Sequence, residues 1–246
     1  MKKPDRLSPA KEIAYIAVTT ALLIGVQFAL YAAPGVECVT VLLLCTSYVF
    51  GARFGALTGL AFSLLRCLLF GFNPQVVALY CIYFPMFGGL FGLIGKADGK
   101  AGAGLAICVN AILAGLSAAA FCAAALDLIK ISITYKALTT ALCWALGAIF
   151  AALLIAFDLV WLFGRGTPRA KRLLWLMFVT TAAAFCTVCF TLLDDVIEPL
   201  ILGMTFDGAM TYFYASFAAM LPQTACTVVS VGLLFYPLTA ILKKLY

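Results

Sequence analysis

Long apolar runs follow one another along nearly the whole chain, broken only by short stretches that contain glycine, proline or charge. About 20 such residues in a helix cross the roughly 30 Å hydrocarbon core of a bilayer, and a helix satisfies its own backbone polar groups there. The runs therefore predict an all-α, polytopic transmembrane bundle in a single domain, residues 1–246. The expected spans lie near 10–33, 37–50, 52–71, 76–95, 102–129, 137–163, 172–193 and 208–242.

The number of crossings is open between six and eight, although the breaks favour eight. The second and third runs share few residues around Gly51, which allows one of them to be short, tilted or partly re-entrant. Composition excludes a soluble domain, because 65% of the residues are hydrophobic and only 11% are charged. Soluble proteins are roughly half apolar and one quarter charged.

Basic residues gather on one side of the predicted membrane. The opposite side keeps Lys130 and Lys136 and collects the acidic residues Glu37, Asp194, Asp195, Glu198 and Asp207. The positive-inside rule then places both termini in the cytoplasm. The net charge of +6 follows from this topology and indicates no nucleic-acid binding. The basic residues on the predicted inner side are Lys2, Lys3, Arg6, Lys11, Arg53, Lys96, Lys100, Arg165, Arg169, Lys171, Arg172, Lys243 and Lys244.

The absence of histidine removes several kinds of chemistry. It excludes Ser-His and Cys-His nucleophiles and the usual histidine zinc site. Cys186 and Cys189 have a C-x-x-C spacing but lie within an apolar run, where cysteine behaves as a small hydrophobe. We therefore expect no enzyme activity, cofactor or metal. An intramembrane aspartyl hydrolase using Asp127, Asp158 or Asp194 is a disfavoured alternative.

Two ladders of small residues recur at every fourth position, which lets helix backbones approach closely. The first comprises Ala17, Ala21, Gly25 and Ala29, and the second comprises Gly51, Gly55, Gly59 and Ser63. Packing within the chain is the favoured interpretation of both. Docking of another membrane subunit is the alternative.

Arg66 is a basic residue well inside a predicted span, so it needs a partner. The alternatives are Glu37, the Asp194 and Asp195 pair, or a ligand. Aromatic residues at the outer ends favour an interfacial belt, and they also suit the wall of a site for a planar ligand. Polar and aromatic residues of this kind are Tyr31, Phe70, Phe72, Asn73, Gln75, Tyr80, Tyr83, Tyr212, Phe213 and Tyr214, and Gln27, Asn110 and Gln223 lie deeper.

Four segments share a pattern of glycine, proline and small residues. The first two are Ala33-Pro34-Gly35-Val36-Glu37-Cys38-Val39-Thr40-Val41-Leu42 and Phe50-Gly51-Ala52-Arg53-Phe54-Gly55, the second followed by Gly59. The other two are Phe70-Gly71-Phe72-Asn73-Pro74 and Phe87-Gly88-Gly89-Leu90-Phe91-Gly92-Leu93-Ile94-Gly95. With the tail from Tyr212 to Lys244, this pattern resembles the substrate-binding S components of energy-coupling-factor (ECF) transporters. The resemblance covers residues 10–95 and 172–243, and the helical pair at 101–163 is extra.

This resemblance implies a subunit of a bacterial plasma-membrane importer that captures a vitamin-like molecule at the outer face. Its expected partners are a transmembrane coupling subunit, docked on Ala17, Ala21 and Gly25, and two ATPases. Pro34–Thr40 is closest to members associated with cobalamin or related compounds, while riboflavin, thiamin and queuosine precursors stay open. A self-sufficient secondary transporter is the alternative. The expected substrate-binding residues are Glu37, Thr40, Arg66, Asn73, Gln75, Tyr80, Tyr83, Asp195, Tyr212 and Gln223.

Overall fold

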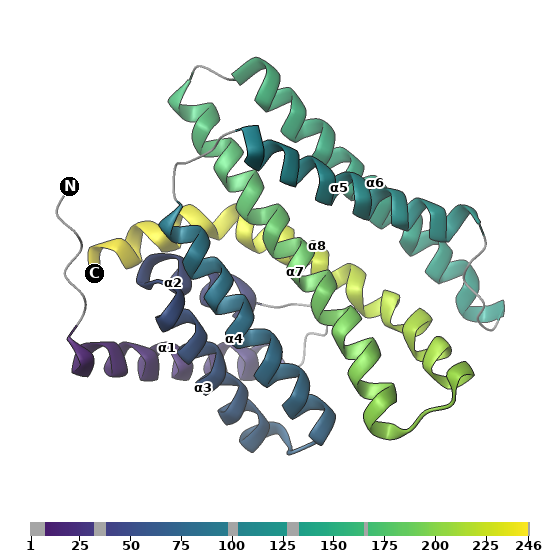
Figure 1. The fold of residues 1–246 in the computed structure, drawn as a ribbon, viewed down its shortest axis with the longest axis horizontal. Coiled ribbons are helices and arrows are strands. Elements are labelled where there is room, and N and C mark those ends of the chain that lie inside the picture. The colour runs from purple at the N-terminus through teal and green to yellow at the C-terminus, as the bar shows by residue number, and fades with distance from the viewer. Residues whose placement is uncertain (1–7, 32–37, 98–102, 127–132, 165–166, 246) are drawn as a thin grey trace. The chain divides into compact units, whose positions relative to one another are not determined.

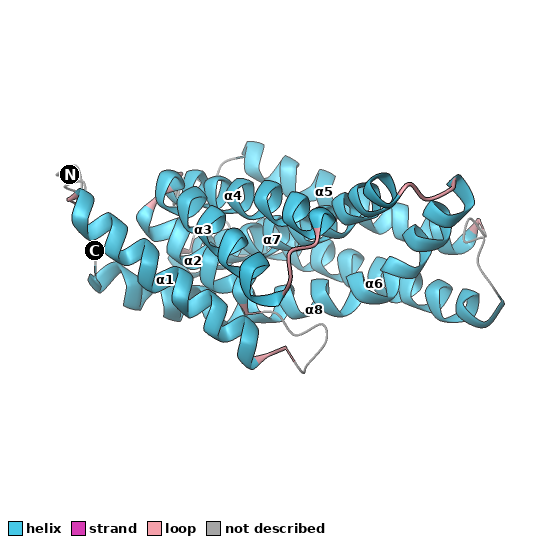
Figure 2. Ribbon diagram, turned by 90° about the horizontal axis from the view of Figure 1, so that it is seen from below, coloured by secondary structure: helices cyan, strands magenta, loops and turns pink. Residues whose placement is uncertain are grey.

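The computed structural model describes residues 8–31, 38–97, 103–126, 133–164 and 167–245, and all their regular structure is helical (Figures 1 and 2). The all-α prediction is thus confirmed. The helices are α1 (Pro9–Ala29), α2 (Val39–Phe50), α3 (Ala52–Phe70), α4 (Pro74–Lys96), α5 (Ala103–Ala125), α6 (Ile133–Gly164), α7 (Pro168–Leu202) and α8 (Phe206–Leu245).

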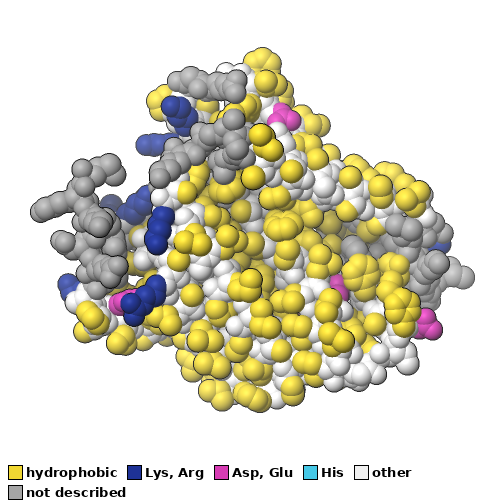
Figure 3. All heavy atoms as spheres, in the orientation of Figure 1, with side chains coloured by type: hydrophobic (Ala, Val, Ile, Leu, Met, Phe, Trp, Pro, Cys, Tyr) yellow, Lys and Arg dark blue, Asp and Glu magenta, His cyan; other side chains and the backbone are white. Residues whose placement is uncertain are grey.

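Among the described residues, seven helices are long and apolar enough to cross a membrane. The exception is α2, whose 12 residues span only about 18 Å. Hydrophobic side chains also dominate the face drawn in Figure 3. The chain is therefore a multi-pass membrane protein, and its second predicted span is indeed a short helix.

Proline and glycine set several helix ends, as the sequence predicts. Proline opens α1, α4 and α7, where its missing N–H has no intrahelical acceptor to lose. Gly51 and Gly71 follow α2 and α3 with φ of 98° and 116°. Side chains rarely adopt such angles, so these two turns favour glycine.

The helices form two compact units, and each is described by itself. Unit 1 comprises residues 1–97 and 236–246, and unit 2 comprises residues 98–235. In unit 1, Arg53 Nε lies 3.6 Å from Glu12 Oε1, while the Phe28 and Phe70 ring centroids lie 5.9 Å apart. These contacts join the starts and the ends of α1 and α3, so the two helices run parallel. The chain between them returns to the Arg53 end, and α2 completes that return.

The end of α8 reaches the same end of unit 1 as the start of α1. Lys243 Nζ lies 5.8 Å from the centre of the Tyr48 ring, and the Tyr15 and Phe50 ring centroids lie 5.6 Å apart. The described parts of both chain ends therefore share one end of the unit. Which side of the membrane this end faces stays a prediction from the positive-inside rule.

The α3 ladder packs against α4. A Cβ atom at Gly55 would overlap the carbonyl oxygen of Gly88, and one at Gly59 would overlap that of Phe84. One turn further, Ser63 Oγ donates a hydrogen bond to the Tyr80 carbonyl oxygen at 2.7 Å. This confirms, for α3, that the ladder serves packing within the chain.

Unit 2 is built from α5, α6, α7 and most of α8. Phe150 and Phe157 of α6 lie in one buried cluster with Leu113 of α5 and Val188 of α7. Ser117 Oγ also donates to the Gly147 carbonyl oxygen at 3.0 Å, which ties α5 to α6. Helix α7 continues to Leu202, beyond residue 193 near which the seventh span was expected to end. Its acidic residues thus lie on a helix face and not in a loop.

Candidate functional site

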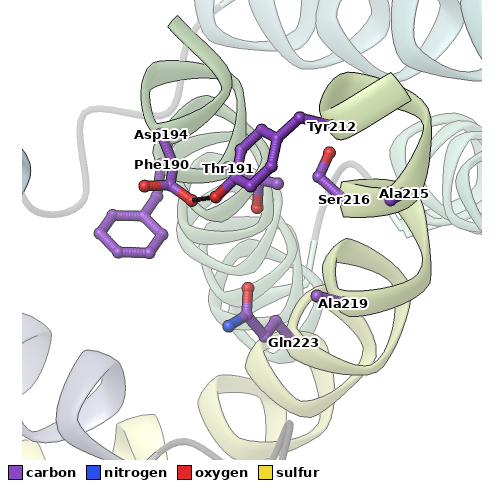
Figure 4. Close-up of a pocket in the computed structure, with 8 residues that line it drawn as sticks. All are labelled: Phe190, Thr191, Asp194, Tyr212, Ala215, Ser216, Ala219 and Gln223. Atoms are coloured by element: carbon purple, nitrogen blue, oxygen red, sulfur yellow. Dashed lines mark hydrogen bonds between the residues drawn. The ribbon is translucent and has the colours of Figure 1, made fainter. Parts of the chain in front are cut away.

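A cavity of about 290 Å³ lies between α7 and α8 within unit 2 (Figure 4). Both helices are longer than a bilayer core requires, and they face each other near the turn that joins them. Residues of both helices line the cavity: Phe190, Thr191 and Asp194 from α7, and Tyr212, Ala215, Ser216, Ala219 and Gln223 from α8.

Two hydroxyl groups of α8 hold two neighbouring carboxylates of α7. Tyr212 Oη donates to Asp194 Oδ2 at 2.8 Å, and Ser216 Oγ donates to Asp195 Oδ2 at 2.8 Å. Tyr212 and Ser216 are four residues apart and therefore share one face of α8. Figure 4 shows the phenol of Tyr212 meeting the carboxylate of Asp194 across the cavity.

Asp195 is the most deeply buried charged group at this site. Its side chain is 8% exposed, and its Oδ1 atom has no hydrogen-bond partner among the described residues. Taking an ionised carboxylate out of water is costly unless another group compensates the charge. Asp195 itself is not one of the lining residues, but Ser216 lines the cavity and donates to Asp195, so this carboxylate lies one hydrogen bond behind the cavity wall.

A seam of hydroxyl groups continues from the cavity between the same two helices. Thr191 lines the cavity, and one turn away the Oγ1 atoms of Thr187 and Thr227 lie 3.0 Å apart. Thr224 precedes Thr227 by one turn of α8 and is also buried. Its Oγ1 has no hydrogen-bond partner among the described residues. The α7 and α8 interface is thus polar well beyond the cavity.

The structure brings three of the expected substrate-binding residues to this cavity. Tyr212 and Gln223 line it, and Asp195 adjoins it through Ser216. Glu37 lies outside the described residues. The other six belong to unit 1: Thr40, Arg66, Asn73, Gln75, Tyr80 and Tyr83.

Arg66 and Tyr80 form a second, smaller group in unit 1. The Arg66 guanidinium lies over the Tyr80 ring at 4.3 Å and over the Phe70 ring at 5.7 Å. Its Nε atom is buried without a hydrogen-bond partner in the described part of the unit. The aromatic rings therefore take part of the role that was expected of a carboxylate or a ligand. Pairing of Arg66 with Glu37, Asp194 or Asp195 stays a prediction.

The remaining expected residues of unit 1 do not converge on Arg66 through any contact described. Asn73 precedes α4 and is exposed, whereas Thr40 is buried in the first turn of α2. Tyr83 packs against the rings of Phe84 and Phe87 at 5.2 and 5.6 Å, so it belongs to the aromatic packing of α4. Gln75 lies half-buried in the first turn of that helix.

The expected docking residues of α1 are all exposed. Ala17, Ala21 and Gly25 make one open face, and a Cβ atom built at Gly25 meets no atom within 4 Å. The buried residues of this helix are Thr19, Thr20 and Leu23, which lie on another face. The small-residue face of α1 is therefore free for contacts with lipid or with another protein.

Sequence reasoning missed Phe190, Thr191, Ala215, Ser216 and Ala219. All but Phe190 are small or weakly polar residues within apolar runs, and nothing local distinguishes them from packing residues. One signal was available: Tyr212, Ser216, Ala219 and Gln223 follow one another at spacings of three or four and so form one helix face.

All ten cysteines are free thiols, including Cys186 and Cys189. Among the described residues, no three His, Cys, Asp or Glu side chains gather as a metal site would require. Asp127 lies outside the described residues, so an aspartyl dyad that includes it stays untested. No family model, no curated protein and no solved structure matches this chain.

Proposed function

We propose that the chain is the substrate-binding subunit of an importer, which captures a small polar molecule between α7 and α8. The cavity carries this proposal. It combines a concave aromatic wall with carboxylate, hydroxyl and amide groups, the mixture typical of small-molecule sites. Its volume suits a compact, vitamin-like molecule or a part of one.

A second feature supports a partner subunit. The face of Ala17, Ala21 and Gly25 offers close approach to another helix, and none of the described residues occupies it at Gly25. In the ECF arrangement, a transmembrane coupling subunit would dock there and two ATPases would supply the energy. The chain would then bind its ligand alone and move it only with these partners.

Purification and reconstitution test the proposal. Protein purified in mild detergent should retain a small molecule that mass spectrometry identifies, and the purified chain alone in sealed vesicles should bind this molecule without concentrating it. Purified protein that is folded but carries no bound small molecule would contradict the binding role.

The second candidate function is a self-sufficient secondary transporter. One observation favours it: Asp195 is a buried carboxylate with one oxygen that has no partner among the described residues, next to a seam of hydroxyl groups. Intramembrane carboxylates of this kind mark ion and proton paths in transporters. Accumulation of the co-purified molecule by the chain alone, driven by a proton or sodium gradient, would favour this candidate over the importer subunit.

A further inference from the structure

We infer that the cavity between α7 and α8 takes a small organic cation, whose ammonium group lies against Asp194 and Asp195. This inference rests on the proposed function, since it names the chemical class of the ligand captured there. It follows from charge, hydrogen-bond supply and shape, each taken from the residues around the cavity.

The charge around the cavity is acidic. Asp194 lines it, Asp195 adjoins it, and none of the described residues that line it is basic. Two neighbouring carboxylates away from bulk water repel each other and lose hydration. A bound cation would offset both costs, whereas an anion would add to them.

The supply of hydrogen bonds is also incomplete on the donor side. Tyr212 donates one bond to Asp194 and Ser216 donates one to Asp195, in each case to the Oδ2 atom. The Oδ1 atom of Asp195 is buried and lacks a partner among the described residues. A primary or secondary ammonium group brings N–H donors and positive charge together, and both match what this oxygen lacks.

The shape of the cavity favours an organic cation over a bare metal ion. Phe190 and Tyr212 provide aromatic surface beside the carboxylates, and rings of this kind attract ammonium groups. Ala215 and Ala219 are small lining residues, and the volume of about 290 Å³ fits a molecule of several heavy atoms. A metal ion would need further oxygen ligands, and the described residues offer no group of three acidic or thiol side chains.

Thermal unfolding of the full chain in detergent tests this inference. Unfolding can be followed with a thiol-reactive fluorophore, because Cys45, Cys143 and Cys186 are buried in the folded protein. The probes are methylammonium, ethylammonium and tetramethylammonium, with acetamide as the neutral control and acetate as the anionic control. Concentrations should reach about 100 mM, at which even a millimolar affinity saturates the site.

We expect the ammonium probes to raise the unfolding temperature in a saturable manner and the two controls to leave it unchanged. Asp195→Asn should raise the half-saturating concentration of the ammonium probes by about tenfold or more, because it removes the charge and keeps the shape of the side chain. Asp207→Asn is the matched control, since it removes one acidic charge from an exposed position of α8 outside the cavity. It should bind the probes like the unaltered protein.

A second variant covers the case in which Asp195→Asn fails to fold. Phe190→Leu keeps the carboxylates and removes one aromatic wall, so it should weaken tetramethylammonium binding by about threefold to tenfold. Unchanged binding of all three ammonium probes in whichever of these variants folds would overturn the inference. Stabilisation by acetamide or acetate alone would overturn it as well.

The co-purified molecule separates this inference from the proposed function. A neutral or anionic molecule bound in the cavity would overturn the cation inference and leave the binding function standing. A missing ligand together with no response to any probe would contradict both the cation inference and the proposed binding function. Stabilisation that depends on pH and Asp195 but not on any ammonium probe would assign the carboxylate to proton binding, which also overturns the inference.

Discussion

Helices α1 and α3 carry the same sequence device and use it in opposite ways. Both present a small residue at every fourth position. On α3, Gly55 and Gly59 are buried against the backbone of α4, whereas on α1 the corresponding face with Ala21 and Gly25 is exposed. The pattern therefore predicts close approach of a helix and does not tell which helix approaches.

The difference between the two ladders comes from what lies opposite. Helix α4 carries Gly88 and Gly92, and a Cβ atom at either would overlap the backbone of α3 at Gly55 or Ala52; one at Gly95 would overlap the backbone of α2 at Tyr48. Two smooth surfaces thus meet between α3 and α4. Helix α1 instead packs through Thr20 and Leu23, and within the described part of unit 1 its small-residue face meets no atom at Gly25. An exposed ladder is what a docking surface for a second membrane protein requires, and four predictions test this interpretation.

The largest effect should come from a matched pair of glycine substitutions. Gly59→Ala puts a methyl group into the Phe84 carbonyl, so α3 and α4 must separate, whereas Gly25→Ala adds the same group in open space. We expect Gly59→Ala to lower the free energy of unfolding by about 1–3 kcal/mol and Gly25→Ala to leave it nearly unchanged. Unfolding in detergent with a chemical denaturant measures both. Equal losses would mean that the α1 face is also a packing surface.

The second effect concerns transport and not stability. Leucine at Ala17 and Ala21 should reduce uptake of the co-purified molecule in cells by tenfold or more, about 1.4 kcal/mol or more in docking. Binding by the solubilised variant should stay within about threefold, because the added bulk lies on an exposed face of α1. Ala114→Leu with Ala118→Leu is the matched control, since these exposed alanines of α5 have the same spacing. Unchanged uptake in the α1 variant would leave its face to lipid alone.

Most of this fold could be predicted from local sequence. The prolines that open α1, α4 and α7 and the glycines at positions 51 and 71 gave the breaks, and apolar length gave the spans. The end of α7 could not be found in this way. Asp194 and Asp195 look like the end of a span, but hydroxyl groups 18 and 21 residues further along the chain hold them, so the helix continues.

The candidate site was predictable only in part for the same reason. Tyr212 and Gln223 were expected from their polar or aromatic character in an apolar run, and Asp195 from its charge. Ser216 was missed because its importance lies in one bond to a residue on another helix. Nothing in the neighbourhood of Ser216 in sequence specifies that bond, since it depends on how α7 and α8 pack.

A smaller effect should come from the last rung of the α3 ladder. Ser63 Oγ contacts the carbonyl oxygens of Gly59 and Tyr80, and only the second lies on another helix. Ser63→Ala should cost about 0.5–1.5 kcal/mol of unfolding free energy, the usual net value of one hydrogen bond. Thr46→Ser is a useful control, because the Thr46 hydroxyl bonds only to carbonyls of its own helix and serine keeps it. If Ser63→Ala lowers the free energy of unfolding by less than about 0.3 kcal/mol, the close approach of α3 and α4 depends on the glycines alone.

The smallest effect should come from the ion pair that joins the two compared helices. Glu12 and Arg53 lie 3.6 Å apart, but the Arg53 side chain is 81% exposed, so water and salt screen the attraction. A double-mutant cycle with Glu12→Gln and Arg53→Gln should give a coupling of about 0.5 kcal/mol or less, which falls further at high salt. Such a value would mean that α1 is held mainly by its buried face, which carries Thr19, Thr20 and Leu23. The opposite face then stays available. A coupling above about 2 kcal/mol would mean that the pair holds α1 in place, and the exposure of Ala17, Ala21 and Gly25 would then depend on one surface contact.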